Sequence, residues 1–171
     1  MKIYLLRHAI AEELKEGYID ENRQLTARGI SICRKVANVL QEDDIRPEII
    51  ITSPYKRTIQ TAEIMQSILV PATKIIVVKF LAPNEDQSRI VRYLQKLKQE
   101  EVMLVGHMPA LSELASLLVA GNTGVSFPLK KNSLLVLRVE GTPGKEFAKS
   151  EMLYWVDKQG NIKRAKYLSL I

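Results

Sequence analysis

The stretch Lys2-Ile3-Tyr4-Leu5-Leu6-Arg7-His8 opens the chain and decides the fold that we predict. Residues 3–6 form a short and mainly apolar run, which is typical of a buried strand. The run ends abruptly in a cation and an imidazole. In an open α/β sheet, ligands bind at the carboxyl ends of the strands, so Arg7 and His8 stand where a functional site is expected.

Short apolar runs recur along the chain and alternate with helical patterns. Further strands are predicted at residues 48–52, 75–78, 102–105, 133–139 and 151–156, and residues 163–171 are interpreted as a short strand or a tail. The polar segment 9–24 has no steady period, and we interpret it as a loop over the site.

Helices are predicted between these strands from apolar spacing and capping chemistry. Thr26 is the expected N-cap of a helix whose apolar stripe is Ile30, Cys33, Ala37 and Leu40. The second helix is expected to begin at Ser53-Pro54 and to bury Tyr55, Ile59, Ala62, Met65 and Leu69. The remaining signals are a capping box of Asn84 and Gln87, Pro109 at a helix start and Gly121 at its end.

This alternation predicts an α/β fold, a single-domain three-layer α/β/α sandwich with a mostly parallel central sheet. The strands at 133–139 and 151–156 are joined by a short connection, so we expect them to pair antiparallel at one side of the sheet. The chain of 171 residues suits one domain spanning residues 1–171, and no internal repeat or linker divides it.

Composition excludes several classes of protein. The net charge is +6, but the cations are spread along the chain, so no basic tract supports nucleic-acid binding. No apolar run approaches the ~20 residues that a membrane span requires. The lone Cys33, with no visible signal peptide, indicates a reducing, cytoplasmic setting. His8 and His107 are the only histidines, which argues against a histidine-rich metal site.

Three predicted strand ends carry residues that suit phosphoryl transfer. Arg7 and His8 follow the first strand, Arg57 lies in the first turn of the helix after the second, and His107 follows the fourth. A neutral imidazole can attack phosphorus, and arginine forks suit the charge on the transferred group. Each residue alone has an ordinary structural explanation, such as a capped carbonyl or a solvated helix position. Their joint placement at one sheet edge favours a site.

These residues stand in motifs that resemble those of the histidine phosphatase (phosphoglycerate mutase-like) superfamily. The matching stretches are Leu6-Arg7-His8-Ala9, Leu25-Thr26-Ala27-Arg28-Gly29, Ser53-Pro54-Tyr55-Lys56-Arg57-Thr58-Ile59-Gln60-Thr61-Ala62 and Val105-Gly106-His107. The small size, the run from Arg7 to Glu12 and the Asp20-x-x-Arg23-x-Leu25-Thr26 pattern are most similar to the SixA-type phosphohistidine phosphatase branch.

The resemblance implies a role for each residue. His8 would be the phosphorylated nucleophile, and Arg7, Arg57 and His107 would complete a phosphate pocket without metal or cofactor. Arg23 reaches the substrate or has a surface role; both interpretations stay open. The implied substrate is a phosphohistidine-bearing protein, for example a histidine phosphotransfer domain, and inorganic phosphate is the product.

One departure from the family pattern bears on the substrate. Many members carry a Glu just after the third strand as the acid for the leaving oxygen, and here Ala82 stands at about that place. Glu85 or Asp86 is the candidate to take over that role, although both also suit the first turn of a helix. Because a phosphoramidate's imidazole leaves more readily than an alkoxide, the missing acid favours a phosphohistidine substrate. The alternatives are a small-molecule phosphomonoesterase and a non-catalytic phosphoprotein-binding module.

Overall fold

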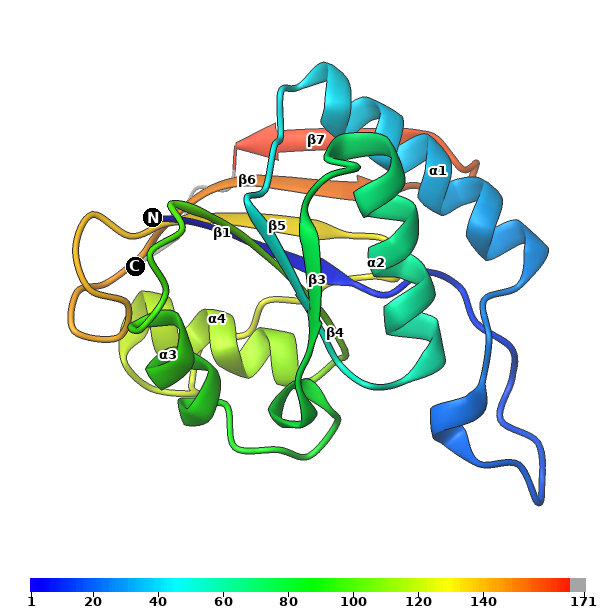
Figure 1. The fold of residues 1–171 in the computed structure, drawn as a ribbon, viewed down its shortest axis with the longest axis horizontal. Helices are drawn as coiled ribbons and strands as arrows, with labels where there is room; N and C mark the ends of the chain where they lie inside the picture. The colour runs from blue at the N-terminus through cyan, green and yellow to red at the C-terminus, as the bar shows by residue number, and fades with distance from the viewer. Residues whose placement is uncertain (167–171) are drawn as a thin grey trace.

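The computed structural model describes residues 1–166, which form one seven-stranded sheet covered by helices (Figure 1). The strands are β1 (Lys2–Arg7), β2 (Ile49–Thr52), β3 (Lys74–Val77), β4 (Glu101–Gly106), β5 (Leu134–Arg138), β6 (Lys149–Val156) and β7 (Ile162–Lys166). Their order across the sheet is β3-β2-β4-β1-β5-β6-β7. Residues 167–171, the end of the segment interpreted as a strand or a tail, lie outside the described residues.

Strand direction divides the sheet into two parts. β3, β2, β4 and β1 run parallel, as predicted. β5 pairs antiparallel with β1, and β6 and β7 extend the sheet in the same antiparallel manner. The predicted antiparallel pair at one side is therefore confirmed, and β7 adds a third strand to that part of the mixed sheet.

Helices cover both faces of the sheet, which confirms the three-layer α/β/α architecture (Figure 1). The α-helices are α1 (Ala27–Glu42), α2 (Lys56–Leu69), α3 (Ser88–Leu94) and α4 (Ala110–Ala120), and two 3₁₀ turns are η1 (Asp20–Asn22) and η2 (Lys79–Leu81). α1 and α2 pack on one face, and α3 and α4 pack on the other. None of these helices is long and apolar enough to cross a membrane within the described chain.

Strand β1 is buried on both faces because it lies between β4 and β5 in the middle of the sheet. Ile3 and Leu5 join the core under α3 and α4, whereas Tyr4 and Leu6 join the core under α1 and α2. A strand whose alternate side chains enter two cores has no polar face, which explains the continuous apolar run in the sequence.

Helix α1 lies close to the chain that leaves β1. Thr26 caps it as predicted, since its side chain accepts a hydrogen bond from the Gly29 backbone N–H at 3.0 Å. A Cβ atom at Gly29 would lie 2.0 Å from the carbonyl oxygen of Ile10, so only glycine permits this approach. Cys33 is fully buried on the apolar stripe of the helix.

Two predicted helix starts are wrong. α2 begins at Lys56, not at Ser53-Pro54, so Tyr55 precedes the helix and is only partly buried. The buried face of α2 is accordingly shifted and includes Arg57 and the neighbouring threonines Thr58 and Thr61.

The predicted capping box before α3 does not form. Gln87 makes no capping hydrogen bond with its side chain, and Asn84 adopts a left-handed backbone conformation with φ of 65°. The Asp86 carboxylate instead accepts the Ser88 N–H at 2.9 Å. At the end of α4, Gly121 adopts φ of 71° and terminates the helix as predicted.

Candidate active site

The parallel register brings three strand ends to one place. Arg7 of β1 is level with Gly106 of β4, and Thr52 of β2 is level with Val105. The residues that follow these strands, His8, Ser53 and His107, therefore share one edge of the sheet. The rings of His8 and His107 are 5.3 Å apart between centroids. The structure thus places both histidines together, as the sequence predicted.

His8 is held in a defined tautomer. Its Nδ1 lies 2.7 Å from the carbonyl oxygen of Ala9, which can only accept, so Nδ1 carries the proton. The pKa of His8 is lowered to about 4, mainly by burial and also by the charges of Arg57, Arg7 and Lys131, while the bond to Ala9 acts to raise it. The ring is neutral at pH 7, and its Nε2 keeps a free electron pair. This is the state that a nucleophile needs.

His107 is oriented by two neighbours. The Arg57 guanidinium lies 3.4 Å from Nδ1 and can only donate, so Nδ1 accepts and Nε2 carries the proton. Nε2 lies 2.8 Å from the Ser53 hydroxyl oxygen. The Tyr55 ring meets the imidazole edge to face at 4.9 Å. The pKa of His107 is lowered to about 3, mainly by burial and then by His8 and Arg57, while the charge of Asp20 acts to raise it.

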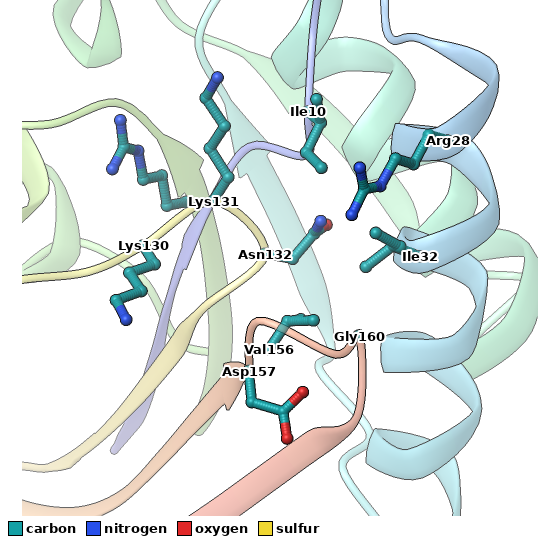
Figure 2. A pocket seen from close by; sticks show the side chains of 10 residues that line it. Ile10, Arg28, Ile32, Lys130, Lys131, Asn132, Val156, Asp157 and Gly160 are labelled. Carbon is teal, nitrogen blue, oxygen red and sulfur yellow. The ribbon is translucent and has the colours of Figure 1, made fainter.

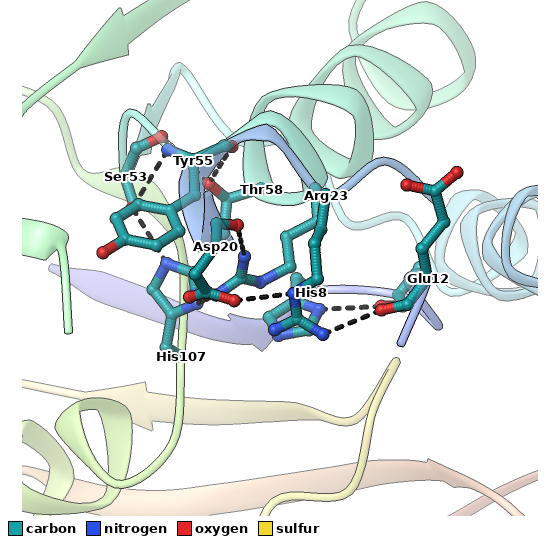
Figure 3. A network of polar contacts seen from close by, with 10 residues as sticks. His8, Glu12, Asp20, Arg23, Ser53, Tyr55, Thr58 and His107 are labelled. Atoms are coloured by element: carbon teal, nitrogen blue, oxygen red, sulfur yellow. Dashed lines mark hydrogen bonds and ion pairs between the residues drawn. The ribbon is translucent and has the colours of Figure 1, made fainter. Parts of the chain in front are cut away.

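Arg57 is almost fully buried at the start of α2 and is held by Asp20 of η1. Its Nη1 donates to the Asp20 carbonyl oxygen at 2.8 Å, and its Nη2 donates to the Asp20 carboxylate at 2.9 Å. Partial burial acts to raise the pKa of Asp20, but Arg57 and Arg23 together bring it below the ordinary value. Asp20 is therefore ionised at neutral pH and lies beside His107 (Figure 3).

Arg7 and Arg57 each have a buried donor without a partner in the described chain. Arg7 donates through Nη1 to the carbonyl oxygen of Leu129 at 2.8 Å. Among the described residues, the Nε atoms of Arg7 and Arg57 are buried without a hydrogen-bond partner. An unpaired buried donor is costly, and phosphoryl oxygens are acceptors of the kind that arginine forks suit. The pocket thus offers two cationic donors next to a neutral imidazole.

Arg23 lies at the rim of this pocket. Its Nε donates to the Asp20 carboxylate at 2.6 Å, and its Nη1 donates to the Glu12 carbonyl oxygen at 2.8 Å (Figure 3). Arg23 thereby ties the loop over the site to Asp20 and, through Asp20, to Arg57. This geometry gives Arg23 a positioning contact; direct contact with a substrate stays a prediction.

The two carboxylates that we considered as acids are engaged at the start of α3. Glu85 accepts from Arg89 Nη1 at 2.9 Å, and Asp86 accepts from the backbone N–H and hydroxyl of Ser88. These contacts match the ordinary first-turn role that both residues also suited. Ala82 terminates η2 and supplies no acid.

Several supporting residues were not identified from the sequence. Ser53 was interpreted as a helix cap, Tyr55 as a core residue, and Asp20 only as part of a motif. Thr61 accepts the Ala9 N–H at 3.1 Å and donates to the Arg57 carbonyl at 2.6 Å, which joins β1 to α2 behind the nucleophile. The Asp20-x-x-Arg23 spacing was the one available signal for Asp20, because both side chains meet at that distance.

The structure thus brings two arginines and two histidines together at one edge of the sheet, a set of side chains whose chemistry suits a phosphoryl group. Comparison with known proteins gives the family. Residues 3–79 match the model of the histidine phosphatase superfamily (branch 1). The chain belongs to this superfamily.

Relatives of known sequence agree with this assignment. The chain is 34% identical to an uncharacterised protein of Picosynechococcus sp. over 142 residues, which cover 81% of this chain and 85% of that one. It is 29% identical to the phosphohistidine phosphatase SixA of Escherichia coli over 130 residues, which cover 74% of this chain and 80% of SixA.

Solved structures share the fold. A structure of the protein histidine phosphatase SixA complexed with tungstate matches with a TM-score of 0.79 and 23% identity, covering 90% of this chain and 96% of that one. The α-ribazole phosphatase of Shigella flexneri matches with a TM-score of 0.69 and 17% identity, covering 88% and 95%. At these identities the likeness establishes the fold alone, because one fold serves several substrates.

Proposed function

We propose that this protein is a phosphohistidine phosphatase that dephosphorylates a phosphohistidine-bearing protein. The observation that carries the proposal is the state of His8, whose protonated Nδ1 is bound to Ala9 and whose Nε2 keeps its electron pair. The similarity to SixA supports the same substrate class. Complete retention of Arg7, His8, Arg57 and His107 speaks against a binding module without catalysis.

The reaction proceeds in two steps. Nε2 of His8 attacks phosphorus, a new N–P bond forms, and the N–P bond to the substrate imidazole breaks as that ring leaves with its electron pair. Water then attacks phosphorus, the N–P bond to His8 breaks with its electron pair returning to Nε2, and both protons of the water leave on inorganic phosphate, so that His8 returns to its neutral form. Arg7 and Arg57 stabilise the charge on the equatorial oxygens in both steps.

His107 contributes to the same charge. Its Nδ1 faces Arg57, and an incoming phosphoryl anion favours protonation of this nitrogen because opposite charges stabilise each other. The protonated Nδ1 no longer accepts from Arg57 Nη2 and donates to a phosphoryl oxygen instead, while Nε2 keeps its contact with the Ser53 hydroxyl. Ser53 and Tyr55 hold the ring in the orientation that this donation requires.

The choice between N–P and ester substrates rests on the missing acid. Asp20 binds Arg57 beside the pocket, but its lowered pKa leaves it ionised and unable to supply a proton. Glu85 and Asp86 are bound at the start of α3. A phosphohistidine ring already protonated on its other nitrogen leaves as neutral imidazole, whereas an alkoxide requires a proton from the enzyme. A small-molecule phosphomonoesterase is therefore the second candidate.

A substrate comparison tests the proposal. We expect kcat/KM for a phosphohistidine-bearing histidine phosphotransfer domain to exceed that for p-nitrophenyl phosphate and for common sugar phosphates by more than about a hundredfold. His8→Ala serves as the control for hydrolysis outside this pocket. A higher kcat/KM for any of the esters would reject the proposal and favour the phosphomonoesterase.

A further inference from the structure

A second cavity adjoins the phosphoryl pocket on the side of α1 and the β6–β7 turn (Figure 2). Its volume is about 370 Å³, which falls in the range of small ligand sites. Arg7 belongs to both places, since it lines the cavity and carries a buried, unpaired Nε beside His8. A molecule with its phosphoryl group at His8 therefore has this cavity within reach.

The lining carries positive charge that the protein does not neutralise. Arg28, Lys130 and Lys131 line the cavity, and in residues 1–166 their side chains make no hydrogen bond or ion pair. The acidic residue in the lining, Asp157, accepts two hydrogen bonds from Asn161 and lies 3.9 Å from Lys163 Nζ. Its charge is thus already engaged, and the cavity attracts anions.

A buried amide is aimed into this charged space. Asn132 is 1% exposed, and its Oδ1 has no hydrogen-bond partner in the described chain. Figure 2 shows its side chain projecting toward Arg28 across the cavity. The Asn132 backbone N–H donates to the carbonyl oxygens of Arg7 and His8, at 3.2 and 3.3 Å, which fixes the residue next to the nucleophile. A buried, unpaired amide oxygen points to a ligand that donates a hydrogen bond.

The cavity lies close enough to the nucleophile for one ligand to engage both. Lys131 is among the charges that lower the pKa of His8. Resting on the function proposed above, we infer that Arg28 and Lys131 form a second anion subsite. This subsite binds a carboxylate of the phosphorylated protein, on a residue next to the phosphohistidine. Asn132 Oδ1 can only accept, so it meets a backbone N–H of the same segment and not the carboxylate.

A protein fits this surface better than a small molecule. The loop that carries Asp20 also exposes three large apolar side chains, Leu14, Tyr18 and Ile19, each more than half exposed. Exposed apolar groups near a charged site are typical of protein–protein contact. The phosphoryl pocket is thus flanked by a loop with apolar side chains and by a cationic cavity. Together they suit an acidic partner surface that presents phosphohistidine.

The test uses two synthetic peptides that carry one phosphohistidine each. One peptide has Glu at the flanking positions, and the other has Gln at the same positions. At low ionic strength we expect kcat/KM to be about tenfold higher for the Glu peptide, and the ratio to shrink as salt screens the charges. Arg28→Gln with Lys131→Gln should bring the ratio close to one.

A matched control separates the subsite from net charge. Arg34 lies on the same helix as Arg28 but lines another cavity, and Lys145 is exposed in a distant loop. The pair Arg34→Gln and Lys145→Gln removes the same charge and should keep the preference. The inference would be overturned if wild type gave equal kcat/KM values for the Glu and Gln peptides. It would also be overturned if the preference for the Glu peptide survived the Arg28 and Lys131 changes.

Two further results have separate meanings. Failure to hydrolyse a phosphohistidine-bearing histidine phosphotransfer domain would reject the proposed function itself, whereas hydrolysis of that domain together with no preference between the two peptides rejects only the subsite. Phosphoglycolate, a small phosphate ester with one carboxylate, provides the remaining comparison. A higher kcat/KM for phosphoglycolate than for the Glu peptide, lost with the Arg28 and Lys131 changes, would assign the cavity to a small metabolite and overturn the inference.

Discussion

The phosphoryl pocket and the adjoining cationic cavity share Arg7 but are built in opposite ways. In the pocket, His8, Arg57 and His107 are at least nine-tenths buried, and each has a fixed hydrogen-bond partner. In the cavity, Arg28, Lys130 and Lys131 are exposed. Charges held in a buried site act strongly and at fixed distances, whereas exposed charges are screened. The pocket is thus suited to chemistry, and the cavity to selecting what reaches it.

The largest expected effect is loss of the nucleophile. His8→Asn removes the attacking Nε2 but keeps a polar side chain of similar size, so we expect kcat to fall by roughly 10⁴-fold. Acid-labile phosphate should no longer be trapped on the protein after brief mixing with substrate. Continued trapping at wild-type level would place the nucleophile elsewhere, and a thermal melt near that of wild type would show that the variant is folded.

The next effect contrasts two arginines, one from each region. Arg57→Lys replaces a fork that bonds both Asp20 and His107 by a single ammonium, so kcat/KM should fall by about 10²- to 10³-fold. Arg28→Lys keeps an exposed point charge and should lower kcat/KM far less. Steady-state kinetics on one phosphohistidine peptide measures both. Similar losses of kcat/KM in Arg57→Lys and Arg28→Lys would contradict the different roles assigned to the pocket and the cavity.

Burial of the two histidines also predicts that the free energy of unfolding falls in acid. The pKa of His8 is lowered from 6.5 to about 4, so between these values the unfolded chain binds a proton that the folded protein does not. The stability attributable to neutral His8 is complete above pH 6.5 and declines as the pH falls toward 4. At pH 5 the loss is about 2 kcal/mol relative to pH 8.

Urea unfolding at pH 8 and pH 5 measures this loss. His8→Asn should lose less free energy of unfolding than wild type over the same interval, although it has no activity. An equal pH dependence in both proteins would show that His8 is not held neutral by burial.

The sequence predicted the pocket better than its surroundings, for a topological reason. His8 and His107 follow parallel strands whose ends must meet at one edge, so order along the chain was sufficient to bring them together. Ser53 was misassigned because Ser-Pro has the chemistry of a helix start, and the hydroxyl instead contacts His107. Arg28 and Lys131 are ordinary surface cations by sequence, and only the packing of α1 beside the chain before β5 makes them neighbours.

The smallest effect concerns Asp20, which links the pocket to its outer loop. Its ionised carboxylate occupies Nη2 of Arg57, a donor that suits a phosphoryl group, so substrate and Asp20 compete for the same guanidinium. Asp20→Asn removes the negative charge and keeps the backbone carbonyl that accepts from Nη1. We expect tungstate to bind about three- to tenfold more tightly to this variant, measured by calorimetry.

The control is Asp44→Asn, which removes an exposed carboxylate paired with Arg46 and should leave the affinity for tungstate unchanged. Weaker binding of tungstate to Asp20→Asn would contradict this competition. It would mean that the Asp20 carboxylate orients Arg57 toward the phosphoryl group.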